Sequence, residues 1–195
     1  MISGSDEKQI WDRAVTFLRR GRPGDVEHTS TVLTYGKTLV ANEGGNPLVV
    51  IPTLILHDVG WSQVDFSDFI SAPPEAKPDV ESVRLHMRRG AQIANDVLND
   101  LGWQPELIRR ITRIIAVHDV PEEIRAMDDL DATLVFEADW LDKYEPSRLR
   151  RYFEGVHDAT ALKELQELLD MHKSQLFRTT TAKQLLERIC TSSRA

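Results

Sequence analysis

The chain has 195 residues, of which 41% are hydrophobic and 28% charged, and its formal net charge is -7. These values fit one soluble globular domain with a sizeable core, whereas the acidic balance argues against a general nucleic-acid-binding surface, which is normally basic. No apolar run approaches the roughly 20 residues that span a bilayer, so we expect no membrane segment. The single cysteine, Cys190, and the absence of a signal peptide indicate the cytoplasm.

Helical periodicity dominates the first part of the chain. An amphipathic helix is predicted over residues 6–20, and a Gly-Arg-Pro-Gly sequence then breaks it. A second helix is predicted over residues 25–41, with His28 in its first turns. A loop with two glycines follows, so the third helix starts as a separate element.

The third helix is predicted to begin at Pro47, because proline suits the first turn of a helix. Its apolar run ends in the doublet His57-Asp58, and Gly60 is placed to stop the helix. Residues 62–78 contain three prolines, which disfavour a continuous helix. We expect a surface loop here, and both a plain connector and a lid over a substrate entrance remain open.

Helices also account for the rest of the chain. The sequence from Asp119 to Glu122 resembles a capped helix start, so capping explains Asp119 better than catalysis does. The periodicity predicts helices over residues 80–101, 105–118, 132–144, 161–172 and 181–190. We therefore predict an all-α, single-domain bundle in which residues 25–145 form the core, residues 1–24 pack on it as an N-terminal helix, and residues 146–195 complete it.

Side chains of the types that bind metals recur in or at the ends of these helices. Imidazole and carboxylate together hold Zn, Fe, Mn or Ni, and helices can aim such groups at one point. Asp58 has two oxygens and can bridge two ions, which permits a first site with His28, His57 and Asp139 and a second with His86 and His118. The predicted ligands are thus His28, His57, Asp58, His86, His118 and Asp139.

The order of these residues resembles the HD-domain superfamily, an all-α family named for its His-Asp doublet. The family pattern places a histidine before the doublet and an aspartate after it, and a binuclear branch adds two histidines between them. Three segments carry the resemblance: Leu54 to Gly60, the His-x-x-x-Gly-Ala sequence from His86, and Phe136 to Asp139. The resemblance covers about residues 25 to 145 and implies a metal-dependent phosphohydrolase with His57 and Asp58 in the catalytic role.

One position departs from the family pattern. Many relatives continue the doublet as His-Asp-x-Gly-Lys, but Trp61 stands here at the lysine position. The departure puts a phosphate contact of the family in question, and Trp61 is expected to line the substrate approach, with core packing as the alternative. Four cations could replace the lysine, namely Arg84, Arg88, Arg89 and Lys143. The alternative is that they are ordinary solvated charges on helix faces.

The leading hypothesis is a phosphohydrolase that acts on a small phosphoester, such as a nucleotide or dinucleotide, through a metal-activated hydroxide. The resemblance implies two divalent transition metal ions, chosen from Fe, Mn, Ni and Zn. One alternative is an HD-type diiron oxygenase of a small organic substrate, because the same ligands suit non-haem iron. Another alternative is a non-enzymatic ligand sensor that retains the metals.

Overall fold

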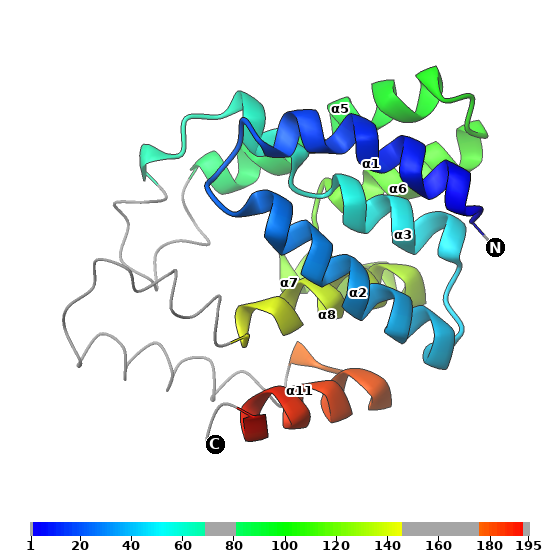
Figure 1. The fold of residues 1–195 in the computed structure, drawn as a ribbon, viewed down its shortest axis with the longest axis vertical. Coiled ribbons are helices and arrows are strands. Elements are labelled where there is room, and N and C mark those ends of the chain that lie inside the picture. Colours follow the sequence, from blue (N-terminus) through cyan, green and yellow to red (C-terminus); the bar gives the residue numbers. More distant parts are fainter. Residues whose placement is uncertain (1, 69–80, 146–175, 193–195) are drawn as a thin grey trace.

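The computed structural model describes residues 2–68, 81–145 and 176–192. All regular structure within these ranges is helical, so the predicted all-α class is confirmed (Figure 1). The predicted helix over 161–172 and residues 69–78 of the predicted loop lie outside the described residues. The elements are α1 (Gly4–Leu18), α2 (Asp25–Glu43), α3 (Pro47–Leu56), the 3-10 helix η1 (Val59–Gln63), α5 (Glu81–Asp100), α6 (Pro105–Ile115), α7 (Pro121–Met127), α8 (Leu130–Lys143) and α11 (Thr180–Ser192).

Local capping sets several of these boundaries. The side chains of Ser3, Asn46 and Asp129 each accept a hydrogen bond from a backbone N–H in the first turn of α1, α3 and α8. Gly24 and Gly44 flank α2 with φ values of 90° and 85°, a left-handed conformation that glycine adopts without steric cost. Short-range signals therefore set the starts of α1, α3 and α8 and both ends of α2.

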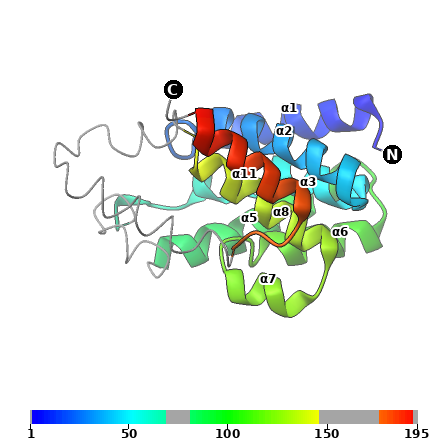
Figure 2. The ribbon, with the colours of Figure 1, turned by 90° about the horizontal axis from the view of Figure 1, so that it is seen from below.

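Helix α3 lies at the centre of the bundle, with every residue from Val49 to Leu56 buried. It contacts α1, α2, α6 and α8. Figure 2 shows α1, α2 and α11 on one side of α3 and α8, and α6 and α7 on the other. A helix that is apolar all round is expected to be buried in this way. The described helices include none with the length and apolar character needed to cross a membrane.

Two helix ends fall earlier than the sequence predicted. The doublet helix was expected to continue to residue 60, but it ends at Leu56, and Asp58 has left the helix with φ -100° and ψ 1°. The helix expected to end at His118 ends at Ile115. Because both helices stop before their ligands, the side chains of the doublet and of His118 project from helix ends.

Two glycines allow η1 to approach α5 closely. A Cβ atom at Gly60 would overlap the backbone carbonyl oxygen of His86, and one at Gly90 would lie 3.1 Å from the carbonyl oxygen of His57. Backbone atoms cannot move aside as a flexible side chain can, so Gly60 requires glycine, whereas a side chain at Gly90 would force the neighbouring backbone to shift by a few tenths of an ångström. This close contact brings His86 of α5 next to the His57-Asp58 doublet.

The two terminal helices pack on the core. Helix α1 buries Ile10 and Leu18 and contacts α3 and η1, while α11 contacts α2 and α8. Glu137 of α8 is fully buried and accepts hydrogen bonds from the backbone N–H groups of Arg178 and Thr179 and from the Thr179 hydroxyl. This carboxylate therefore ties the segment before α11 to the core.

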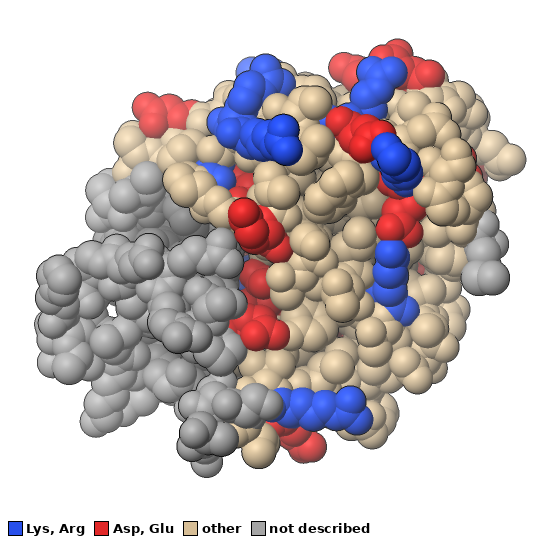
Figure 3. All heavy atoms as spheres, in the orientation of Figure 1, with Lys and Arg blue, Asp and Glu red and all other residues tan. Residues whose placement is uncertain are grey.

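On the face drawn in Figure 3, the Lys and Arg side chains are interspersed with Asp and Glu.

Candidate metal centre

The structure brings all six predicted ligands together in the interior of the bundle. Each of them is at most 3% exposed, and together with Asp119 they form three overlapping groups whose ligand atoms lie within 4.8 Å of one another. Buried charged groups are costly unless they are paired or coordinate a metal. The positions come from five different parts of the fold: His28 on α2, His57 and Asp58 after α3, His86 on α5, His118 after α6, and Asp139 on α8.

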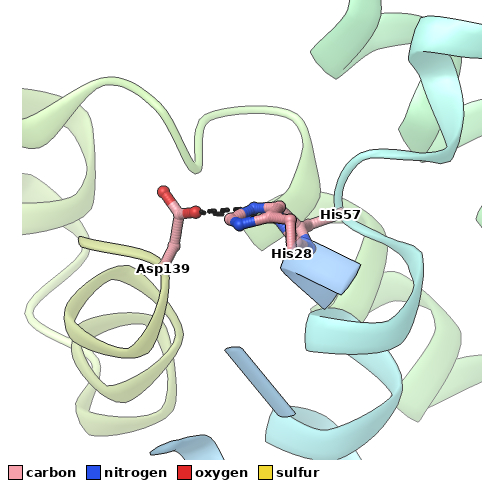
Figure 4. Close-up of side chains that lie close together, drawn as sticks. All are labelled: His28, His57 and Asp139. Carbon is pink, nitrogen blue, oxygen red and sulfur yellow. Dashed lines mark hydrogen bonds and ion pairs between the residues drawn. The ribbon is translucent and has the colours of Figure 1, made fainter. Parts of the chain in front are cut away.

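The first group joins the start of α2 to the middle of α8. His28 Nε2 lies 3.1 Å from His57 Nε2 and 3.1 Å from Asp139 Oδ1. His57 Nε2 is 3.7 Å from the same Asp139 oxygen. Figure 4 shows Asp139 pointing from α8 toward the two imidazoles. Two nitrogens and one carboxylate oxygen thus converge at one point.

The second group lies between α5 and the end of α6. His86 Nε2 is 3.4 Å from His118 Nε2. The carboxylate of Asp119 also faces this pair, with Oδ2 at 3.5 Å from His86 Nε2 and 3.7 Å from His118 Nε2. The two groups are adjacent, because the His57 and His118 rings meet edge to face with centroids 5.1 Å apart.

Asp58 lies between the two groups and turns one oxygen to each. Its Oδ2 is 3.4 Å from His28 Nε2 and 3.5 Å from His57 Nε2. Its Oδ1 is 3.5 Å from His86 Nε2 and 3.6 Å from His118 Nε2. This one carboxylate is therefore in position to contact ions in both groups.

Hydrogen bonds at the helix ends fix the tautomers of two imidazoles. His57 Nδ1 lies 2.8 Å from the carbonyl oxygen of Leu54, and His118 Nδ1 lies 2.8 Å from that of Ile115. These carbonyls belong to the last turns of α3 and α6, where the helix itself leaves acceptors unused. A carbonyl can only accept, so Nδ1 carries a proton, and in the neutral ring Nε2 presents its lone pair to the centre.

His28 is held by a carboxylate instead, because its Nδ1 lies 2.6 Å from Asp142 Oδ2. His86 Nδ1 is buried and has no hydrogen-bond partner among the described residues, but its ring stacks on Trp61 at 4.0 Å. All four imidazoles thus direct Nε2 inward. Nitrogen lone pairs as close as those of His28 and His57 repel unless a cation or a proton lies between them, so the donor set fits a metal site.

Burial and the neighbouring carboxylates shift the pKa values of the imidazoles at the centre in opposite directions. Burial lowers the pKa of His57 to about 4, so this imidazole is neutral near pH 7. Burial also acts to lower the pKa of His118 and His28, but neighbouring carboxylates outweigh it. Asp119 and Asp58 raise the pKa of His118 to about 9, and hydrogen bonds to Asp139, Asp142 and Asp58 raise that of His28 well above its usual value. Protons on these two rings therefore balance the carboxylates when no metal is bound.

Trp61 is fully buried behind the ligands, which corresponds to the core-packing alternative and not to an open wall of the substrate approach. Its Nε1–H donates to Asp58 Oδ1 over 3.1 Å, while Arg22 Nη2 donates to Asp58 Oδ2 over 2.6 Å. The Arg22 guanidinium also lies over the Trp61 ring, 4.3 Å from its centroid. Trp61 and Arg22 together hold both oxygens of the central carboxylate.

Of the four cations proposed to replace the missing lysine, only Lys143 lies at the centre. Its Nζ is 3.2 Å from Asp139 Oδ2. Arg84 and Arg88 are more than half exposed and pair with Glu123 and Glu81, and the exposed Arg89 donates to Gln92. The structure therefore places Arg88 and Arg89 on the solvated face of α5, which corresponds to the alternative of ordinary solvated charges.

Among three further residues at the centre, Asp119 was misjudged and Arg22 was missed, whereas Asp142 was expected either to support the ligands or to lie at the surface. The cap of α7 is Val120, without a side-chain hydrogen bond, so the capping interpretation of Asp119 was wrong. Asp142 follows Asp139 by one helical turn, and that spacing was the signal for its contact with His28. Arg22 lies in a turn between glycine and proline, and no motif at this position indicates a functional side chain.

An all-α bundle with a buried centre of histidine and aspartate around a His-Asp doublet defines the class of this protein. A family model described as "HD domain" matches residues 25–144, and the chain therefore belongs to the HD-domain family. This finding confirms the resemblance to the HD-domain superfamily, while the assignment to its binuclear branch stays a prediction.

A comparison with solved structures finds the crystal structure of a predicted HD superfamily hydrolase from an uncultured Thermotogales bacterium. The match has a TM-score of 0.61 at 18% sequence identity and covers 96% of this chain and 86% of that chain. At this identity, the likeness establishes the common fold. A search of curated proteins gave no match.

Proposed function

We propose that the protein is a metal-dependent phosphohydrolase whose centre holds two divalent ions joined through Asp58. The observation that carries the proposal is the position of this carboxylate, with Oδ2 facing His28 and His57 and Oδ1 facing His86 and His118. Membership of the HD-domain family supports a metal-dependent hydrolase, and the donor set of this chain supports the presence of two ions.

The assignment of ligands follows the two groups. His28, His57 and Asp139 would hold one ion together with Asp58 Oδ2, and His86 and His118 would hold the other with Asp58 Oδ1. Mixed imidazole and carboxylate ligands suit Fe, Mn, Ni and Zn. Bound ions would supply an activated water and neutralise negative charge on the phosphoryl group.

The chain itself contributes orientation, charge and exclusion of water. The carbonyls of Leu54 and Ile115 hold the imidazoles of His57 and His118 in the tautomer that binds metal. Arg22 and Lys143 place positive charge beside Asp58 and Asp139, at two places on the centre. A preorganised, largely dry site of this kind stabilises charge that develops during phosphoryl transfer. We infer that the substrate is a small phosphoester, such as a nucleotide or dinucleotide.

The test is a reconstitution experiment on the full chain. Protein stripped with a chelator is reloaded with Mn²⁺, Fe²⁺, Ni²⁺ or Zn²⁺ and assayed for phosphate release from aryl phosphates, nucleotides and dinucleotides. Asp58→Asn is the matched inactive variant, because it preserves the shape of the side chain and removes its charge. Turnover that needs metal and disappears in Asp58→Asn supports the proposal.

The ligand chemistry also favours one second candidate, a diiron oxygenase, because two histidines with carboxylate suit non-haem iron. Protein purified without oxygen and loaded with Fe²⁺ would then consume O₂ in the presence of a small organic substrate and release no phosphate. Retention of metal without turnover in either assay would favour the sensor alternative.

A further inference from the structure

We propose that Asp119 is a ligand of the second metal site, in addition to the six residues of the family pattern. This inference rests on the proposed two-ion centre and concerns how the ion beside His86 and His118 is held. The ion expected at this site is divalent, such as Mn²⁺ or Fe²⁺, because carboxylate oxygens suit the harder ions of the first transition row.

The position of Asp119 is the first line of evidence. Its Oδ2 faces both imidazoles of the second group, at 3.5 Å from His86 Nε2 and 3.7 Å from His118 Nε2. These three residues form one of the groups whose ligand atoms converge. Because α6 ends at Ile115, His118 and Asp119 lie in the turn before α7, and both side chains reach the same centre.

The second line of evidence is the match between the two groups. The first group has two imidazoles and a carboxylate of its own, Asp139, in addition to the shared Asp58. Without Asp119, the second group would have two imidazoles and only one oxygen of Asp58. With Asp119 included, each ion receives two nitrogens, one oxygen of Asp58 and one carboxylate that it does not share.

Lys143 provides the third line of evidence, because it connects the two unshared carboxylates. Its Nζ lies 3.2 Å from Asp139 Oδ2 and 3.4 Å from Asp119 Oδ1. Each carboxylate therefore gives its outer oxygen to the ammonium group and directs its inner oxygen at imidazole nitrogens. Hydrogen bonds of this type commonly orient metal-binding carboxylates, so Lys143 acts as a positioning residue for both sites.

Asp119 differs from the other ligands in its exposure. Its side chain is 21% exposed, whereas the side chains of the six residues of the pattern are at most 5% exposed. At the second site, the partly exposed carboxylate of Asp119 thus lies between the two imidazoles and the solvent. We infer that the ion there exchanges more readily than the ion beside His28 and Asp139.

The experiment titrates Mn²⁺ into the full, metal-stripped chain and measures the number of bound ions and their dissociation constants. The wild type is expected to bind two ions and to give the electron paramagnetic resonance spectrum of a coupled Mn²⁺ pair. In Asp119→Asn the second ion should bind at least about tenfold more weakly, since even outer partners of metal ligands contribute 10- to 100-fold. The coupled spectrum should then give way to that of a single ion.

Glu122→Gln is the matched control. Glu122 lies three residues after Asp119, its side chain is 77% exposed, and the substitution also removes one carboxylate charge. It should bind both ions as the wild type does. Asp119→Ser provides the same comparison if the amide disturbs folding. Two ions of unchanged affinity in the Asp119 variants would overturn this inference, whereas a wild type that binds one ion would overturn the two-ion centre itself.

Discussion

Arg22 donates a hydrogen bond of 2.6 Å to Asp58, although Arg22 precedes the residues that match the family model. The same guanidinium donates through Nε to Asp25 and lies over the ring of Trp61. Burial acts to raise the pKa of Asp58, but Arg22 and the nearby imidazoles hold it well below its usual value. A tryptophan at the usual lysine position is therefore combined with an arginine that reaches the doublet from the turn after α1.

Arg22→Lys should weaken metal binding or turnover by about 10- to 100-fold, the range expected for a partner that orients a metal ligand. Lysine keeps the charge but cannot contact Asp25 and Asp58 through two separate nitrogens or stack as a planar group. Metal content and kcat/KM of the reloaded protein measure the effect. Arg20→Lys is the control, because Arg20 also lies over an aromatic ring, that of Phe17, but is exposed. Equal losses in both variants would contradict a specific role for Arg22.

Asp58→Ala should lose more activity than His86→Ala. Asp58 faces both histidine pairs, whereas His86 belongs to the second group alone. Removing the shared carboxylate should empty or disorganise both sites, while His86→Ala should leave the first ion in place. Elemental analysis of both variants after reloading checks this difference. Full metal retention in Asp58→Ala would show that the doublet does not bind the ions.

The helices and most of the centre follow from local sequence signals. Periodicity, capping residues and glycines located most of the described helices, and the ordered histidines and aspartates indicated the six candidate ligands. These signals act within a few residues along the chain. The early ends of α3 and α6 were not predicted, because the apolar pattern continues past Leu56 and Ile115 while the backbone leaves the helix.

The residues around the ligands depend on contacts between distant segments. Arg22 and Trp61 meet at Asp58 only because α1 and η1 pack together. Asp119 stands two residues before Pro121, a position typical of a helix cap. Only the folded structure shows that its side chain points toward His86. The same reason applies to Arg88, which was expected to contact substrate but is exposed and pairs with Glu81. The position of a residue along a helix does not by itself show whether its side chain faces the centre.

Trp61→Ala should destabilise the fold by about 3–5 kcal/mol, the usual effect of truncating a large buried aromatic side chain. The indole is 0% exposed and stacks on His86. Trp61→Phe should keep much of this packing and lose the hydrogen bond to Asp58, so it should affect metal affinity more than stability. Urea unfolding and Mn²⁺ titration separate the two effects. A Trp61→Ala variant of wild-type stability with a raised KM would instead support a role in lining the substrate approach.

Glu137→Ala should destabilise the attachment of α11 without changing the metal centre. The substitution removes the acceptor of two backbone N–H groups and the Thr179 hydroxyl, and each buried donor left unsatisfied costs roughly 1–3 kcal/mol. Glu137→Gln should cost less, because its amide oxygen still accepts. Hydrogen exchange should show faster opening of α11 in Glu137→Ala, together with unchanged Mn²⁺ stoichiometry. Equal protection of α11 in the wild type and the alanine variant would contradict this attachment.

Metal should stabilise the chain more strongly at pH 8 than at pH 6. Metal ligands must be deprotonated to bind an ion. Burial acts to lower the pKa of His118, but Asp119 and Asp58 outweigh burial and raise this pKa to about 9. A bound ion must therefore displace a proton, and this displacement becomes easier as the pH rises. Free metal at 100 times its dissociation constant adds about 2.7 kcal/mol to the free energy of unfolding. Thermal unfolding with and without Mn²⁺ at the two pH values measures the difference, and Asp58→Asn should abolish most of the stabilisation. A metal effect that is larger at pH 6 would contradict competition between protons and metal at these imidazoles.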